Sequence, residues 1–318
     1  SGLPPLMHYR FGQCIAEIAS RLDRRVVYIA SGDLSHKLKE DGPYGFAAEG
    51  PVFDRECTAD LEKGDFLSLL QMDPELSEGA AECGLRSFWI MAGALDRQAV
   101  KSELVSYEGP FGVGYGVAMF QVTGPDASRN IGEQFVAAEE QRLAALKQAE
   151  DPFVKLARLS LETYVKTGEY AELPKELPAE LTQKKAGAFV SLKKEGQLRG
   201  CIGTILPSQA NLADEILYNA VSAAAHDPRF DPVKSEELDA LVYSVDVLTE
   251  PEAIASEEQL DVKRYGVIVE AGGRRGVLLP DLAGVDTVAE QVAIARRKGS
   301  IRPTEPVSLW RFEVVRHH

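Results

Sequence analysis

Residues 198–204 read Leu198-Arg199-Gly200-Cys201-Ile202-Gly203-Thr204. The run is predicted to be a buried strand, yet it places an arginine, a thiol and two glycines side by side, which ordinary packing rarely needs. Gly200 and Gly203 remove side chains from the strand, so that a ligand or another backbone can come close. Arg199 offers a planar fork that suits a carboxylate or a phosphate. We therefore expect a ligand-binding cleft around Arg199, Gly200 and Gly203.

Cys201 is a candidate catalytic nucleophile, because cationic neighbours such as Arg199 or His226 would favour its thiolate. The alternative is that Cys201 is a buried and inert thiol, with Arg199 paired to Asp227 or Glu215. Residues 225–230 read AHDPRF and follow a predicted helix. His226 and Arg229 are predicted to face the cleft, while the alternative is that Asp227-Pro228 only forms a turn.

The pattern of residues 151–318 predicts an α+β domain, because strands and helices are mixed without strict alternation. Asp151 is predicted to cap a helix that has Pro152 at its first position and runs to about residue 166. Residues 168–183 are predicted to be a loop. Further helices are expected at 209–225 and 285–298, and strands at 187–193, 198–205, 241–248, 266–271, 276–279 and 308–315.

Three segments of this half, LRGCIGT (198–204), NAVSAAAHDPRF (219–230) and VSLWRFEVV (307–315), resemble the AMMECR domain. The resemblance covers residues 151–315 and places the domain at 151–318, after a linker helix at 126–150. It implies a larger and a smaller subdomain that flank a cleft, with LRGCIGT near that cleft. It does not imply a settled biochemical activity.

The first half of the chain has its own chemical feature at residues 26–36. Residues 26–30, VVYIA, are a continuous apolar run, which predicts a strand buried on both faces of a parallel sheet. Ser31-Gly32-Asp33 would then form the turn at its carboxyl end, where α/β sheets build their sites, with His36 beside it. An imidazole can take a proton and return it near neutral pH. Asp33 and Ser35 either orient His36 or cap a helix.

The remaining pattern of this half predicts an α/β fold. Helices are expected at residues 9–22, 52–72, 79–95 and 131–149, and strands at 100–107 and 114–121.

The stretches VVYIASGDLSHKL (26–38), GAAECGLRSFWIMAGAL (79–95) and GPFGVGYGVAMF (109–120) resemble the class III extradiol dioxygenases of the LigB-like and Memo superfamily. The resemblance covers about residues 1–125. It implies a non-haem Fe(II), or another divalent metal, held by two histidines and one further ligand. It also implies that His36 acts as an acid/base, and that either Glu82 or Cys83 ligates the metal. The alternative is that Glu82 caps the following helix and Cys83 is a small buried apolar residue.

Only His8 and His36 occur in this half, and His8 matches no ligand position. The resemblance therefore implies that the N-terminal domain is incomplete and that its other metal ligands lie outside these 318 residues. An incomplete domain would expose sheet edge and apolar surface. We expect a missing segment or a second copy of the chain to cover them.

Composition limits the classes of partner. The hydrophobic and charged fractions, 45% and 26%, are those of a soluble globular protein, and a net charge of −14 argues against nucleic-acid binding. No apolar run is long enough to span a membrane. The cysteines Cys14, Cys57, Cys83 and Cys201 form no CxxC pair, so we expect a reducing, cytoplasmic location.

The two resemblances together imply a protein of the AmmeMemoRadiSam type, which acts beside a radical-SAM partner on an unidentified small molecule or modified macromolecule. This chain lacks the CxxxCxxC cluster motif, so it is not the radical-SAM component. Two functions remain open at this point. One is an oxidoreductase of the extradiol class, and the other is a non-catalytic binding or scaffold protein.

Overall fold

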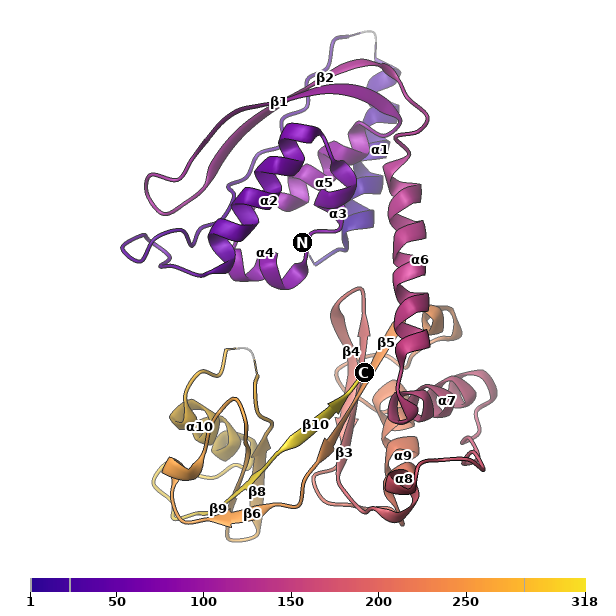
Figure 1. Ribbon diagram of the computed structural model, residues 1–318, viewed down its shortest axis with the longest axis vertical. Coiled ribbons are helices and arrows are strands. Elements are labelled where there is room, and N and C mark those ends of the chain that lie inside the picture. The colour runs from indigo at the N-terminus through magenta and orange to yellow at the C-terminus, as the bar shows by residue number, and fades with distance from the viewer. Residues whose placement is uncertain (1, 23, 283) are drawn as a thin grey trace. The chain divides into compact units, whose positions relative to one another are not determined.

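The protein divides into two compact units, Ser1–Arg142 and Leu143–His318, in a computed structural model that describes residues 2–22, 24–282 and 284–318 (Figure 1). Helix α6 (Ile131–Ala149), which the sequence predicted with the same bounds, runs across the division between them. Helices and strands are mixed in both units. The predicted fold class, α/β followed by α+β, is confirmed.

The N-terminal unit is built mainly from helices that pack around one apolar core. They are α1 (Pro5–Ser20), α2 (Glu49–Lys63), α3 (Phe66–Leu70), α4 (Pro74–Ala80) and α5 (Leu85–Ala94). The helix predicted at 52–72 is two helices, because Gly64 adopts a left-handed φ of 66° and ends α2. The helix predicted at 79–95 begins only at Leu85, as α5, because residues 79 and 80 end α4 and residues 81–84 form a turn.

Strands β1 (Gln98–Glu108) and β2 (Tyr115–Pro125) form a long antiparallel ribbon, which arches over α2 in Figure 1. Both strands were predicted, and both are longer than expected. Buried side chains from the helices fill the core of the unit, among them Tyr9, Phe53, Phe66, Leu69 and Leu85.

The strand predicted at residues 26–30 is wrong. These residues belong to no helix or strand of the described chain, and Val27 and Ile29 are 84% and 81% exposed. The apolar run was interpreted as a strand buried inside a sheet, but the sheet of this unit consists of β1 and β2 alone among the described residues. A run of β-branched residues can form a ladder only where a neighbouring strand supplies the hydrogen bonds.

Helices α1 and α5 contact each other main chain to main chain. A Cβ atom on Gly12 would lie 1.9 Å from the carbonyl oxygen of Ile90, and one on Gly93 would lie 1.9 Å from the carbonyl oxygen of Tyr9. Both distances are far below van der Waals contact. The two glycines therefore set how closely the helices approach.

The C-terminal unit contains two antiparallel four-stranded sheets. The first has the order β10-β5-β3-β4, and the second has the order β6-β9-β7-β8. The strands of the first sheet are β3 (Ala188–Lys194), β4 (Gln197–Gly203), β5 (Leu241–Leu248) and β10 (Val314–His317). Those of the second are β6 (Glu252–Ile254), β7 (Gly266–Ala271), β8 (Arg274–Leu278) and β9 (Ser308–Phe312).

Helices cover one face of each sheet. Helices α7 (Pro152–Thr167) and α9 (Leu212–Ala225) pack on the first sheet, and α10 (Val288–Lys298) packs on the second. The short helices are α8 (Ala179–Gln183), which falls inside the predicted loop, and the 3-10 turns Ser235–Ala240 and Glu257–Gln259. Asp151 caps α7 as predicted, because its side chain accepts hydrogen bonds from the amides of Phe153 and Val154.

The strand predicted at 308–315 is two strands in different sheets, because the chain leaves the second sheet after β9 and enters the first as β10. The connection between β5 and β6 crosses between the same sheets. The two crossings are tied together: Thr249 donates its amide to the carbonyl of Glu313 at 2.9 Å, and Glu313 donates its amide to the Thr249 hydroxyl at 2.8 Å. The residues on either side of this point, Leu248, Phe312 and Val314, share one apolar cluster.

Replacing Gly93 with alanine should destabilise the N-terminal unit by about 2–4 kcal/mol, because the new Cβ overlaps the Tyr9 carbonyl. Helix propensity alone predicts the opposite sign, a gain of up to about 1 kcal/mol. Urea unfolding of the variant measures the difference. The comparison variant Ala16→Gly in α1 should cost only about 1 kcal/mol. Equal or higher stability for Gly93→Ala would contradict the close packing.

Candidate functional site

The loop at residues 33–36 is held rigidly by contacts from three elements. Ser35 donates its amide to the buried carboxylate of Asp54 on α2 at 2.7 Å, and its carbonyl accepts a hydrogen bond from the Gly114 amide at 2.8 Å. The Ser35 hydroxyl and the His36 amide both donate to the carbonyl of Ala80, at 3.1 and 3.0 Å. The position of His36 is therefore fixed from α2, from α4 and from the turn before β2.

Asp54 anchors this loop from inside the core, where it is 1% exposed. Its second carboxylate oxygen accepts a hydrogen bond from the Tyr107 hydroxyl at 2.6 Å. Burial raises the pKa of Asp54 above its ordinary value, while the hydrogen bonds from Tyr107 and Ser35 oppose the rise.

Two glycines bring the loop against a turn that lies 50 residues away in the chain. A Cβ on Gly32 would lie 2.3 Å from the Cα atom of Gly84, so the two main chains touch. Next to this contact, the Asp33 amide donates to Cys83 Sγ at 3.2 Å and the Cys83 amide donates to the Asp33 carbonyl at 3.3 Å. Asp33 and Cys83 thus each donate one hydrogen bond to the other.

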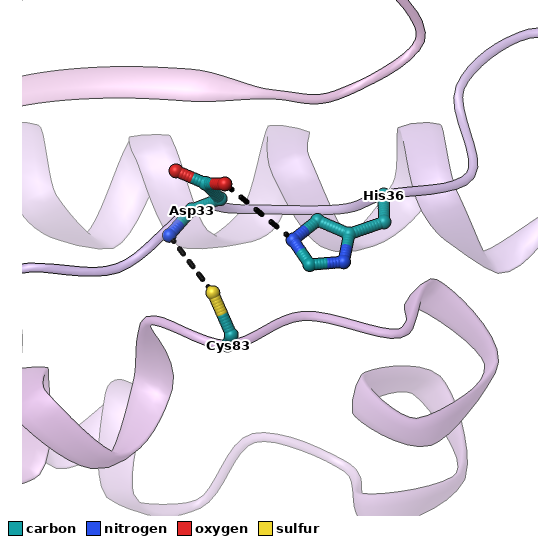
Figure 2. Close-up of side chains that lie close together, drawn as sticks. All are labelled: Asp33, His36 and Cys83. Carbon is teal, nitrogen blue, oxygen red and sulfur yellow. Dashed lines mark hydrogen bonds and ion pairs between the residues drawn. The ribbon is translucent and has the colours of Figure 1, made fainter. Parts of the chain in front are cut away.

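His36 lies in the same place, as Figure 2 shows. Its Nε2 atom is 3.6 Å from Asp33 Oδ2, and its ring stacks on Tyr44 with the centroids 5.0 Å apart. The Nε2 atom is buried and has no hydrogen-bond partner among the described residues. A buried polar atom without a partner costs free energy, so this nitrogen is suited to a ligand.

Asp33, His36 and Cys83 together could hold a metal ion. One ligand atom from each lies within 4.8 Å of the others, and no other such group occurs among the described residues. An imidazole nitrogen, a carboxylate oxygen and a thiolate sulfur suit zinc and divalent iron. The donor set present therefore fits a divalent metal of the kind that the LigB resemblance implies.

The structure separates the two residues that the sequence offered as alternative ligands. Cys83 belongs to this cluster, whereas Glu82 accepts a hydrogen bond from the Leu85 amide at 2.6 Å and so caps the start of α5. His8 lies on α1, where its ring packs against Trp89, and it is not a member of the cluster.

In the C-terminal unit, Arg199 sits at a β-bulge where the register between β3 and β4 shifts. Bulges re-aim side chains, and here the guanidinium makes two hydrogen bonds to Glu237, at 3.0 and 2.9 Å. It also donates to the carbonyl of Asp231 at 2.9 Å. The alternative pairing of Arg199 with Asp227 or Glu215 is therefore wrong, because the side chain at the bulge binds Glu237 instead.

Asp227 and Arg229 cover the free edge of β4, which is the outermost strand of its sheet. The Cys201 amide donates to Asp227 Oδ2 at 2.9 Å, and Arg229 donates to the Cys201 carbonyl at 3.1 Å. Arg229 also binds the Asp227 carboxylate with two nitrogens, and these hydrogen bonds hold the pKa of Asp227 well below its usual range. The pair satisfies edge groups that would otherwise be open to another strand.

Close packing surrounds the other predicted cleft residues. A Cβ on Gly200 would lie 2.2 Å from the Ala223 carbonyl of α9, and one on Gly203 would lie 2.3 Å from the Phe189 ring. Cys201 is half-buried and accepts a hydrogen bond from the Ser191 hydroxyl at 3.2 Å. His226 is exposed at the C-terminal cap of α9. The two glycines were predicted to let either a ligand or another part of the protein come close. In the structure the space beside them is filled by protein atoms.

Sequence reasoning missed the groups that hold both sites in place. Asp54, Tyr44 and Glu237 come from separate elements, and no local spacing links them to His36 or Arg199. Glu215 was considered only as a partner of Arg199, although an acidic residue in the first turn of an otherwise apolar helix indicates a buried role of its own. It is fully buried and binds the loop after β4 through Thr204, Ser208 and Gln209.

Comparison with known proteins agrees with this two-part architecture. Residues 154–317 match the AMMECR1 family, and residues 2–118 match the family described as the catalytic LigB subunit of aromatic ring-opening dioxygenase. The chain belongs to the AMMECR1 family, with a LigB-type domain fused in front of it. The resemblances to the AMMECR and LigB-like families that the motifs indicated are confirmed.

A protein of Clostridium acetobutylicum is 46% identical over 310 residues, which cover 97% of this chain and 66% of that protein. The chain thus spans slightly less than two thirds of that relative's length. A protein of Thermotoga maritima is 51% identical over 53% of this chain and 98% of its own length. A crystal structure of a Pyrococcus horikoshii protein is 37% identical, covers 52% of this chain and 88% of its own, and gives a TM-score of 0.48.

The structure also bears on membrane association. Among the helices of residues 2–22, 24–282 and 284–318, none combines the length and the apolar character that crossing a bilayer requires.

The Arg199–Glu237 pair should make stability depend on pH in the acid range. The hydrogen bonds from Arg199 lower the pKa of Glu237 from its ordinary value of 4.5 to about 2. A carboxyl group whose pKa is lower in the folded state stabilises the protein above its unfolded pKa, and this contribution is lost between about pH 4.5 and 2. Glu237→Gln should therefore flatten the fall in stability across this window, as urea unfolding at stepped pH would measure.

The matched control is Glu236→Gln, which changes the neighbouring exposed carboxyl. It should leave the pH profile close to that of the wild-type protein. If both variants had the same profile, the Arg199–Glu237 pair would not be the cause.

Proposed function

We propose that the N-terminal unit carries a divalent-metal centre of LigB type, formed on this chain by Asp33, His36 and Cys83, and that the protein is a metal-dependent oxidoreductase acting on an aromatic hydroxyl compound. The observation that carries the proposal is the convergence of three unlike donor atoms around a buried histidine nitrogen that has no hydrogen-bond partner among the described residues. The relationship to aromatic ring-opening dioxygenases supports the substrate class.

The metal, when bound, supplies the Lewis acidity that polarises a coordinated oxygen and the open positions at which substrate can bind. The protein side chains supply position. Gly32 and Gly84 let the two loops touch. The hydrogen bonds of Ser35 with Asp54 and Ala80 fix the position of the neighbouring His36. A site held by packed contacts keeps its geometry when a ligand binds.

Tyr44 provides a surface beside His36 that suits an aromatic ring. It stacks on His36, and 60% of the residue is exposed, so part of the phenol ring is open to solvent. An aromatic substrate could pack on this ring while its hydroxyl group points at the metal ligands.

A second candidate function is binding without turnover, beside a radical-SAM partner of the kind that the AmmeMemoRadiSam resemblance implies. It is favoured by the C-terminal unit, where Arg199 and Arg229 are both committed to carboxylates of the same chain. Such arginines are suited to holding a rigid surface, and Cys201 would then be a structural residue. Metal binding at Cys83 distinguishes the two functions, because a scaffold does not need it.

Cobalt(II) should bind the full 318-residue chain and give a thiolate-to-cobalt charge-transfer absorption from Cys83. Cys83→Ser should remove this absorption, because serine offers no thiolate. Titration followed by absorption spectroscopy measures both. Cys14→Ser is the control, since Cys14 is also an exposed cysteine but lies on α1 outside the cluster. A band that survives in Cys83→Ser would overturn the assignment.

His36→Ala should weaken cobalt binding by about tenfold or more, since it removes one of three protein ligands. Equilibrium dialysis at fixed pH measures the metal bound, and circular dichroism confirms that the variant is folded. Unchanged binding would contradict a ligand role. It would assign His36 instead to proton transfer, paired with Asp33, as the LigB resemblance implies.

A further inference from the structure

A groove of about 410 Å³ lies between helices α1 and α6 of the N-terminal unit. Its walls are two stripes of side chains spaced three and four residues apart, a spacing that places them on one face of each helix. The stripes include Tyr9, Arg10 and Gln13 on α1 and Val136, Ala137 and Glu140 on α6. The three candidate metal ligands do not line this groove. Its volume is within the range of sites that bind small molecules.

A largely buried carboxylate, that of Asp96, also lines the groove. One of its oxygens accepts a hydrogen bond from the Tyr9 hydroxyl at 2.5 Å, and the other accepts one from the Gln13 side-chain amide at 2.8 Å. Tyr9 is fully buried, and burial raises the pKa of its hydroxyl, so the hydroxyl stays protonated and donates. The Asp96 side chain is 16% exposed, and each carboxylate oxygen has capacity for a further hydrogen bond.

A strained turn holds Asp96 in this place. The next residue, Arg97, has a left-handed φ of 55°, which residues with a side chain adopt rarely. Two main-chain hydrogen bonds fix it there: the Arg97 amide donates to the Arg129 carbonyl at 2.9 Å, and the Asp126 amide donates to the Arg97 carbonyl at 2.8 Å. Backbone strain that the surrounding contacts maintain is concentrated at binding and active sites. The turn therefore supports a binding role for the groove.

Two lining side chains of opposite charge have no partner. Within the part of the chain that the structure describes, neither the Arg10 guanidinium on α1 nor the Glu140 carboxylate on α6 makes an ion pair or a hydrogen bond. The other cation of the lining, Arg97, is paired with Glu133 at the start of α6. The groove therefore offers a ligand one available cation and, counting Asp96, two carboxylates.

A ligand that is complementary to these groups carries a charge of each sign. A purely anionic molecule would leave Glu140 without a partner, and a purely cationic one would leave Arg10 without a partner. A carboxylate fits the planar fork of Arg10, and an ammonium group has three N–H donors, enough for both Asp96 and Glu140. The rest of the lining is partly apolar, with the side chains of Leu6, Val136 and Ala137. These suit an aliphatic side chain on the ligand.

We infer that the groove between α1 and α6 binds a free α-amino acid with an aliphatic side chain, with its carboxylate on Arg10 and its ammonium group between Asp96 and Glu140. An occupant in this position contacts both helices at once. The site is separate from the proposed metal centre, and the inference does not depend on the metal.

Equilibrium dialysis of the 318-residue chain against radiolabelled L-leucine tests the inference, and saturable binding of one leucine per chain is expected. Arg10→Gln and Glu140→Gln should each weaken this binding by at least about tenfold, because each removes the partner of one charged group of the ligand. Both positions are exposed, so the variants should stay folded, which circular dichroism would verify.

The matched controls are Arg25→Gln and Glu139→Gln, which change charged residues outside the lining of the groove. Both should bind leucine as the wild-type chain does. Cys83→Ser should also leave leucine binding unchanged, which separates this result from the outcome of the metal proposal.

Two analogues each remove one charge of the ligand. 4-Methylpentanoate lacks the ammonium group and leucinamide lacks the carboxylate, so each should compete with leucine at least about tenfold more weakly than leucine itself. Glu140→Gln should not weaken the binding of 4-methylpentanoate further, and Arg10→Gln should not weaken that of leucinamide further.

Three results would overturn the inference. One is an analogue that competes as well as leucine, and another is leucine binding that both Arg10→Gln and Glu140→Gln leave unchanged. The third is an absence of saturation up to about 10 mM leucine, because that excludes a Kd of about 1 mM or below.

Discussion

Main-chain contact at glycine is the constraint on which the arrangement of both sites depends. In the N-terminal unit, the main chains of two loops touch at Gly32 and Gly84. A side chain at Gly32 would push the loops apart and move Cys83 away from His36. In the C-terminal unit, Gly200 lets β4 lie directly on the backbone of α9. At both places the main-chain contact is what brings the side chains of the site close together. The same kind of contact, at Gly12 and Gly93, joins α1 to α5.

The two units use their polar groups differently. In the C-terminal unit, the cationic groups that the sequence offered for a ligand are paired within the chain: Arg199 binds Glu237, and Arg229 binds Asp227. In the N-terminal unit, His36 lies near Asp33, but its buried Nε2 atom makes no hydrogen bond to any residue that the structure describes. A paired arginine stabilises a surface, whereas an unpaired buried nitrogen carries a cost that a bound ligand would remove. This contrast supports the proposal of a metal centre in the N-terminal unit.

The sequence predicted local structure well wherever the decisive contacts are local. The Asp151 cap, α6 and β5 all follow from capping chemistry or periodicity within a short window. The prediction for residues 26–30 was wrong, because the same apolar run is compatible with a strand inside a sheet and with an extended segment that has no paired strand. The sites show the same limit. His36 and Cys83 were chosen from motifs, but the Asp54 anchor and the Glu237 partner depend on tertiary contacts that no spacing reveals.

The double crossing between the two sheets of the C-terminal unit determines how that unit can deform. A single connecting strand would leave its two sheets free to twist about it as well as to bend. Here two strands cross side by side and are bonded to each other through Thr249 and Glu313. Two parallel connections resist twisting, so bending about one axis is the movement that costs least. Any movement of one sheet relative to the other would therefore follow that single axis, and the two sheets would keep the same edges together at Thr249 and Glu313 throughout the movement.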